Sequence, residues 1–357
     1  MSNLTQFFGS GGGAFGKRTL ILYSGDWLVP VGVTKVRAHA WGGGGGGGYT
    51  SYIGAAMGGG GGAYTTFDFS VTPNTTIKIV LGAGGLGAIN PSATQIANNG
   101  TAGGNTSITY GSKIITAGGG QGGTGFISTT PATLSANGGI AANGSINING
   151  GNTHHITLTM ATNQMYVAFG GAAAATPMYG TPPNTALSIS VGGGFVAVGG
   201  HGVNGYTVPT SLSTSGPGGG GGTAPERLTP SAISAAGLPS YGLTQTNGTS
   251  GGGSNADWVV LSGYDFLQIF GNGGAGLSVN GNGNGGPGGG GGGNNGQYTG
   301  GSGGYFGGGG AGCNNGGSTG GKGGLGGGGG GGTNSYGAYL SQYKGGDGGQ
   351  GIVILEW

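Results

Sequence analysis

The residues that could perform acid–base chemistry are few in this chain. Among its seven acidic residues, Asp257 and Asp265 stand close together, with Trp258 and Tyr264 between them. Two carboxylates beside aromatic rings are typical of the acid–base pair of a glycosidase. The alternative is that both acids only make a surface loop soluble. We favour this second interpretation and predict that the chain has no catalytic residue and is not an enzyme.

Other motifs could bind a metal or a phosphate. His154 and His155 are adjacent, but His39 and His201 show no ligand spacing with them and no carboxylate lies nearby. Residues 281–286 (GNGNGG) resemble part of a phosphate-binding loop, yet no strand–turn–helix pattern surrounds them. The single cysteine, Cys313, can close no internal disulfide. We therefore predict no metal site and no cofactor.

Aromatic residues between the glycine runs are a better signal for binding. Rings held on rigid loops stack on sugars or contact the apolar surface of a partner. The six residues that we predict to bind a receptor are Tyr166, Tyr179, Tyr206, Tyr241, Trp258 and Tyr264. The alternative is that half or more of the loop aromatics, which also include Phe169, Tyr305 and Phe306, only cap the scaffold.

The scaffold that would position these residues has an unusual composition. Of 357 residues, 105 are glycine, while 9 are basic and 7 acidic. Each residue ordered on folding costs roughly 1–2 kcal/mol of backbone entropy, so a folded glycine-rich chain needs dense hydrogen bonding. Collagen is excluded, because the glycines form contiguous runs and prolines number only 13. The basic residues are scattered, which argues against a nucleic acid partner.

Both ends of the chain carry strand patterns. Residues 34–41 alternate, with Val36, Ala38 and Ala40 on one face. Similar patterns predict strands at residues 19–23, 64–71, 76–81 and 352–357. We expect these strands to form a small antiparallel β-sandwich assembled from both chain ends.

The glycine runs show a three-residue period. Residues 300–305, 320–328 and 345–351 place a side chain at every third position, and polyproline II has three residues per turn with no internal hydrogen bonds. Glycine on the other two edges lets such helices pack closely and bond to one another. An α-helix is excluded because glycine costs about 1 kcal/mol per residue relative to alanine. The sequence therefore predicts a polyglycine II bundle.

The predicted fold is mainly β, with essentially no α-helix. Residues 1–16 form an N-terminal attachment peptide or a frayed end, residues 17–87 and 345–357 the β-sandwich, and residues 88–344 the polyglycine II bundle. The longest inserts, 126–169, 223–250 and 255–270, are expected to be loops that gather at the ends of the bundle and bind a receptor. Neither a signal peptide nor an apolar span of about 20 residues is found, which indicates a soluble protein made in a cytoplasm.

Three stretches carry a resemblance to a known family. They are VPVGVTKVRAHAWGGGGGGG (29–48), GGGGGAYTTFDFSVTPNTTIKIVLGAGG (58–85) and GGDGGQGIVILEW (345–357). This pattern resembles the glycine-rich domain of bacteriophage tail fibre proteins. The middle of the chain is similar in style to the distal tail-fibre adhesins of T-even-like phages, whose polyglycine II bundles carry receptor-contacting loops.

The resemblance implies a virion tail protein that is assembled in the host cytoplasm and recognises a bacterial surface. Its partners would be other virion tail proteins and a bacterial surface polysaccharide or outer-membrane protein. Phage fibres are commonly homotrimers, which is our expectation here, although the tip adhesins are monomers. The alternative is a purely structural virion appendage or decoration protein without receptor binding. An ice-binding role would need a repeated Thr on one face of the bundle, whereas the three-residue repeats carry Tyr, Lys, Leu, Asp and Gln. The sequence leaves open which end of the bundle faces outward.

Overall fold

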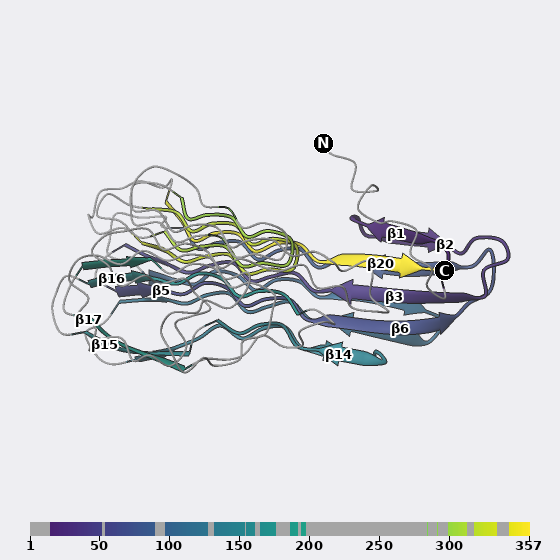
Figure 1. Ribbon diagram of the computed structural model, residues 1–357, viewed down its shortest axis with the longest axis horizontal. Coiled ribbons are helices and arrows are strands. Elements are labelled where there is room, and N and C mark those ends of the chain that lie inside the picture. The colour runs from purple at the N-terminus through teal and green to yellow at the C-terminus, as the bar shows by residue number, and fades with distance from the viewer. Residues whose placement is uncertain are drawn as a thin grey trace.

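The computed structural model describes residues 15–51, 54–89, 97–127, 132–153, 155–160, 165–175, 186–191, 194–197, 284, 291, 299–312, 318–333 and 343–357. The molecule is elongated, with two larger sheets at one end, a bundle of extended glycine-rich segments in the middle and short strands at the other end (Figure 1). The predicted mainly β fold is confirmed: the described residues form strands and no α-helix. The described residues therefore include no helix that is long and apolar enough to span a membrane.

The first sheet of the sandwich, which we call sheet A, joins the two ends of the chain. Its five strands are antiparallel, in the order β1 (Arg18–Ile21), β20 (Ile352–Glu356), β3 (Lys35–Trp41), β6 (Tyr64–Ser70) and β14 (Ile146–Ile148). Beyond β1, Lys17 and Trp357 exchange two backbone hydrogen bonds of 2.9 and 3.0 Å. Strand β20 therefore lies inside the sheet, between the first strand and the central one.

The second sheet, sheet B, packs against the inner face of sheet A. Its antiparallel strands, in order, are β13 (Ala141–Ala142), β10 (Lys113–Ala117), β9 (Thr106–Tyr110), β7 (Thr76–Val80) and β2 (Gly25–Leu28). The core between the sheets contains Val36, Ala38 and Ala40, as their alternation predicts, and Ile77 and Ile79 face them from sheet B. The five strands predicted at residues 19–23, 34–41, 64–71, 76–81 and 352–357 are all present, as β1, β3, β6, β7 and β20.

The sheets and the bundle do not divide at the predicted boundaries. Strands β9, β10, β13 and β14 come from residues 106–148, a region predicted to belong to the bundle. Conversely, the glycine runs 42–48 and 58–62 belong to the bundle, although they lie between sandwich strands. The reason is that the chain passes repeatedly from a strand directly into a glycine run, so both structures are built from the same segments.

Residues 42–48 form the centre of the bundle, and their hydrogen bonds repeat every three residues. Each N–H donates to one of three antiparallel runs at 2.8–3.0 Å: Gly42 and Gly45 donate to Ala63 and Gly60, Gly43 and Gly46 to Gly104 and Thr101, and Gly44 and Gly47 to Gly349 and Gly346. The carbonyls accept from three parallel runs, with Gly85, Gly120 and Gly329 donating to Gly44, Gly43 and Gly45. The central run is thus a helix with three residues per turn, surrounded by six neighbouring runs.

Close packing explains why this run contains only glycine. A Cβ added at Gly44, Gly45 or Gly47 would collide with the carbonyl oxygen of Gly327, Gln121 or Gly330, respectively. The colliding atoms belong to backbones that are themselves hydrogen-bonded. At the rim of the bundle, by contrast, Lys322 and Gln350 of the three-residue repeats are exposed, as their spacing predicts.

Two tight turns reverse the bundle where it meets the sandwich. Residues 304–307 and 324–327 each close with an N–H···O=C bond between first and last residue. Phe306 (φ 65°) and Gly326 (φ 69°) occupy the same left-handed position of these turns. Phe306 is buried and packs against Trp41, with ring centroids 5.1 Å apart. This contact joins the sandwich to the bundle.

Short strands end the bundle at the side away from the sandwich, which we call the distal end (Figure 1). They form three small sheets, β11-β5-β16-β18, β12-β15-β17 and β19-β4-β8. Their bounds are β4 (Tyr49–Thr50), β5 (Gly54–Ala56), β8 (Ala97–Asn98), β11 (Gly125–Phe126), β12 (Ala132–Leu134), β15 (His155–Met160), β16 (Met165–Ala168), β17 (Ala186–Val191), β18 (Gly194–Ala197) and β19 (Gly332–Thr333).

Candidate functional site

The distal end is where the long connections between bundle segments begin and end. At the distal end, backbone hydrogen bonds run from the N–H groups of Gly48, Ala88 and Gly345 to the carbonyl oxygens of Met57, Gly47 and Ala88, respectively. Because each pair of joined segments runs in opposite directions, the chain leaves and re-enters the bundle on the same side. The connections that do so span residues 49–56, 89–97, 125–135, 152–168, 312–318 and 333–344.

Connections at the sandwich end are short. The hairpin of β9 and β10 turns at Gly111 and Ser112, and the two bundle turns centre on residues 305–306 and 325–326. Gly111 has a φ of 57°, in the left-handed region that glycine adopts without strain. The two ends of the molecule therefore differ in a way that the sequence analysis left open: the described long connections belong to the distal end.

One of the six predicted receptor-binding residues can be placed. Tyr166 lies in β16 at the distal end, in register with Gly54 of β5 and Phe195 of β18. The predicted residues Tyr179, Tyr206, Tyr241, Trp258 and Tyr264 lie outside the described residues, as do Asp257, Asp265, His154 and Cys313.

Three other loop aromatics contribute to packing instead. Phe169 is fully buried, Phe306 is 4% exposed and Tyr305 is partly buried beside the same cluster as Trp41. For these three residues the capping interpretation holds. Aromatic identity alone did not separate such residues from binding residues.

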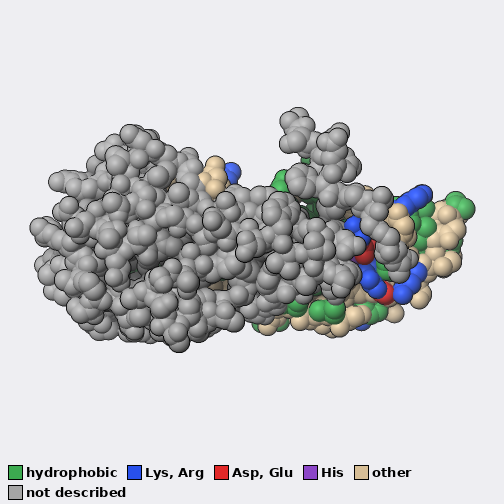
Figure 2. Space-filling view, viewed as in Figure 1, with side chains coloured by type: hydrophobic (Ala, Val, Ile, Leu, Met, Phe, Trp, Pro, Cys, Tyr) green, Lys and Arg blue, Asp and Glu red, His purple; other side chains and the backbone are tan. Residues whose placement is uncertain are grey.

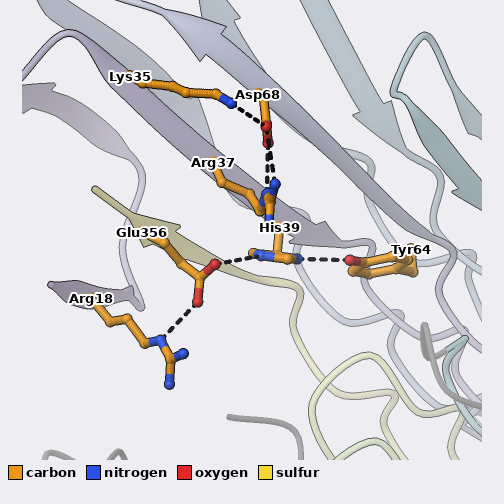
Figure 3. Close-up of polar contacts among 7 residues, drawn as sticks. All are labelled: Arg18, Lys35, Arg37, His39, Tyr64, Asp68 and Glu356. Atoms are coloured by element: carbon orange, nitrogen blue, oxygen red, sulfur yellow. Dashed lines mark hydrogen bonds and ion pairs between the residues drawn. The ribbon is translucent and has the colours of Figure 1, made fainter. Parts of the chain in front are cut away.

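A polar cluster on the outer face of sheet A is the other group of residues whose types could take part in acid–base chemistry (Figure 3). Arg18 Nε lies 2.7 Å from Glu356 Oε1, and Glu356 Oε2 lies 3.4 Å from His39 Nε2. On the other side of the ring, Nδ1 of His39 is 2.7 Å from the Tyr64 hydroxyl. The cluster thus crosses β1, β20, β3 and β6 in turn.

A second ion pair extends this cluster along β3 and β6. Arg37 forms a bidentate pair with Asp68 at 2.7 and 3.0 Å, and Lys35 lies 3.0 Å from the same carboxylate. The Arg37 guanidinium lies 4.8 Å from the ring centre of Phe15, which is buried. Because Arg37 and Asp68 are directly opposed across the strands, the pair stabilises this register.

Burial determines the charge states in the cluster. Burial lowers the pKa of His39, and its neutral ring is consistent with Nε2–H donating to Glu356 while Nδ1 accepts from Tyr64. Burial alone would raise the pKa of Glu356, but the hydrogen bond from His39 and the charge of Arg18 hold it below its usual range. The hydrogen bond from Arg37 is the main reason that the pKa of Asp68 is lowered.

The carboxylate of Glu356, the imidazole of His39 and the hydroxyl of Tyr64 follow one another, and such groups form proton relays in enzymes. Here, however, His39 is 1% exposed and Tyr64 is fully buried, so a substrate does not reach either group. The arrangement ties strands from both chain ends together and does not form an active site. By alternation, Lys35, Arg37, His39 and Trp41 share the face of the strand opposite Val36, Ala38 and Ala40. Alternation alone would leave that face exposed, but His39 and Trp41 on it are buried.

The described residues contain no group of three or more His, Cys, Asp or Glu side chains that could hold a metal ion. Comparison with protein families matches residues 19–225 to a glycine-rich domain. The matched part includes most strands of both sandwich sheets and the distal strands up to β18. No curated protein matches the chain.

Proposed function

The chain belongs to the glycine-rich domain family, and we propose that within this family it acts as a bacteriophage tail fibre or tip adhesin that binds the host cell surface. The observation that carries this proposal is the separation of the two ends of the molecule. The described long connections begin and end at the distal end, while the backbones of Lys17 and Trp357 are paired at the sandwich end. A link to other virion tail proteins at either terminus would leave from the sandwich, opposite the binding surface.

The bundle between these ends suits an adhesin. Its central run bonds to neighbours on all sides, so the distal strands stand on a scaffold held by backbone hydrogen bonds rather than by side chains. Loops on such a scaffold can vary in sequence while the scaffold is preserved. In this proposal, Tyr166 contacts a bacterial surface polysaccharide or outer-membrane protein.

Binding of the fluorescently labelled chain to a panel of bacterial strains tests the proposal. We expect selective staining of some strains. A variant in which residues 90–96 are replaced by a short Gly-Ser-Asn segment should lose staining of at least part of the panel. The matched control replaces Gly111 and Ser112 by Asn and Gly at the sandwich end and should bind as the wild type does.

Circular dichroism and light scattering complete this experiment. Both variants must keep the wild-type spectrum, and light scattering distinguishes the proposed homotrimer from a monomer. If no strain susceptible to the parent virus is stained by the wild type, the protein is instead a structural virion appendage. Equal staining by both variants would remove the 90–96 connection from the binding surface.

A further inference from the structure

Exposed hydrophobic residues gather on one side of the molecule. Nine large hydrophobic residues are exposed among those that the structure describes. Five of them belong to sheet B or to the glycine run that continues it, namely Leu28, Val80, Leu86, Ile89 and Ile114. Single exposed hydrophobic residues are normal on a protein surface, whereas a contiguous group marks a contact surface. The relative positions of these five residues therefore matter.

Three of the five lie on the outer face of sheet B. Ile77 and Ile79 belong to the core between the sheets, so alternation places the residues between and beside them on the outer face. In register, this face carries Leu28 on β2, Thr76, Lys78 and Val80 on β7, Thr109 on β9 and Ile114 on β10. Leu28 is 59% exposed, Val80 40% and Ile114 48%.

The other two residues extend this row along the bundle. Strand β7 leads directly into the glycine run 82–88, and the exposed positions that follow are Ala83, Leu86 and Ile89. Residues three apart share one edge of a helix with three residues per turn. Leu86 is 65% exposed and Ile89 55%. Exposed aliphatic side chains therefore continue from the sandwich to the distal end.

The bundle has only one layer of runs outside its centre on this side. Among the described residues, the backbone hydrogen bonds of runs 82–88 and 100–104 go only to the central run, to each other and to the two runs beside them. Elsewhere a second layer is present, as the bonds from Gly61 to Gly151 and from Gln121 to Asn137 show. Run 100–104 leads into β9, the neighbour of β7, so the sheet and the two runs form one continuous side.

This side is almost uncharged. The sequence from Ile79 to Ser112 contains no Asp, Glu, Lys or Arg, and the outer face of sheet B carries Asp26 and Lys78 opposite each other in register. The other side of the sandwich differs: acidic and basic side chains lie next to one another where β20, β3 and β6 face the viewer (Figure 2). There His39 is buried. The chain thus covers the outer face of sheet A and leaves that of sheet B open.

From these observations we propose that copies of this chain associate with one another through this side. We call it the lateral surface: the outer face of sheet B together with the exposed edges of runs 82–89 and 99–105. The proposal goes beyond the adhesin function, because it assigns a surface for self-association and holds whether or not the distal end binds a receptor.

The size of the lateral surface suits a specific interface. Residues 76–80 span about 17 Å at about 3.4 Å per residue, and residues 81–89 span about 28 Å at about 3.1 Å per residue. Five strands about 4.8 Å apart make sheet B about 20 Å wide, and the two runs cover roughly half that width. The surface then measures roughly 600 Å² per copy, and about 1,200 Å² for two copies is the lower end of stable protein interfaces.

A second copy fits this surface better than other partners do. Because the surface is neutral, it does not repel its own copy, and Asp26 of one copy can pair with Lys78 of another. Interfaces between identical chains are also the more apolar ones. A polysaccharide would require exposed aromatic rings, and the described exposed residues of the lateral surface include none. A nucleic acid would require rows of Lys and Arg.

Light scattering of the full chain between about 1 and 100 µM tests the proposal. We expect an oligomer, and Leu86→Asn and Ile114→Thr should each raise its dissociation constant at least tenfold. The matched control is Ile146→Thr, which makes the same change at a 40% exposed residue of β14 in sheet A and should leave the mass unchanged. Circular dichroism must show that all three variants are folded.

Hydroxyl-radical footprinting of the wild type provides a readout that does not depend on variants. Oxidation of Leu86 and Ile114 should fall at least threefold when the concentration rises from below to above the dissociation constant. Oxidation of Ile146 and Tyr23, which lie outside the lateral surface, should stay the same.

The outcomes are distinct. A wild type with the mass of one copy at 100 µM overturns the proposal. An oligomer in which Leu86 and Ile114 stay fully oxidised, or which Ile146→Thr weakens as much as Ile114→Thr does, places the interface elsewhere and overturns it as well. None of these results bears on the adhesin function, which the staining of bacterial strains tests separately.

Discussion

Replacement of Gly45 by alanine tests the packing of the bundle most directly. The added methyl group would collide with the carbonyl oxygen of Gln121, which already accepts a 2.8 Å hydrogen bond from the Gly60 N–H. Gly45 itself donates to Gly60 and accepts from Gly329, each at 2.9 Å. Relief of the collision therefore requires movement of at least two neighbouring segments.

The expected cost follows from these three hydrogen bonds. A buried backbone group left without its partner costs about 1–3 kcal/mol, so loss of all three would cost about 3–9 kcal/mol. Small domains have unfolding free energies of about 5–15 kcal/mol, which makes this a severe substitution. Gly25→Ala is the control, because its Cβ meets no atom within 4 Å and alanine loses less backbone entropy on folding than glycine, by at most about 0.5–1 kcal/mol.

Urea unfolding followed by circular dichroism and tryptophan fluorescence gives the free energy of unfolding of each variant. We expect Gly45→Ala to be destabilised by at least about 3 kcal/mol and Gly25→Ala to equal or exceed the wild type. Gly44→Ala and Gly47→Ala should match Gly45→Ala, because every side of the central run is occupied. A Gly45→Ala variant within 1 kcal/mol of the wild type would refute the six-neighbour arrangement.

Three further predictions concern the sandwich and its junction with the bundle. Phe306→Gly should relieve about 1–2 kcal/mol of left-handed backbone strain but lose a buried aromatic side chain worth about 3–5 kcal/mol, so urea unfolding should show a net loss of roughly 1–4 kcal/mol. Glu356→Gln should destabilise the chain by about 1.5–3 kcal/mol, since a neutral amide replaces the carboxylate that faces Arg18 and His39, and thermal melts should show more of this loss at pH 7 than at pH 3. Stability should fall as the pH drops below 6.5, because the lowered pKa of His39 means that the unfolded state binds the proton first; a second fall below pH 4.5 should follow from the lowered pKa values of Glu356 and Asp68. A His39→Gln variant should lose the upper part of this pH dependence in melts recorded between pH 7.5 and 3, and its lower part should weaken as well, because the hydrogen bond from His39 helps to lower the pKa of Glu356. A stability that rose on acidification would contradict the assignment.

The strands at the chain ends could be predicted because alternation is a local signal. Val36, Ala38 and Ala40 indicate the buried face of β3 without knowledge of its partners. The three-residue spacing around Asp347 and Gln350 similarly predicts the helix type of the bundle. Each of these signals resides in the segment that it describes.

Features that depend on the direction of a segment could not be predicted. A glycine run such as 42–48 carries no side chain to indicate which neighbours it meets or which way they run, so the end that carries the long connections was left open. The hairpin of β9 and β10 was missed because its two five-residue strands stand between glycine runs. The burial of His39 and Glu356 was missed because it depends on what lies over the outer face of sheet A, which no periodicity within β3 reveals.

The internal position of β20 has a consequence for synthesis of the protein on the ribosome. Strand β3 finds its partner on that side only when residues 352–356 have been made, and the run before them completes the bonding of Gly44 and Gly47. Translation must therefore proceed through almost the whole chain before the fold can close. A product truncated before residue 345 lacks an inner strand of the sheet and a wall of the bundle, which leaves it open to proteases. Until residue 356 has been translated, the edge of β3 that β20 covers stays unpaired and open to pairing with other strands.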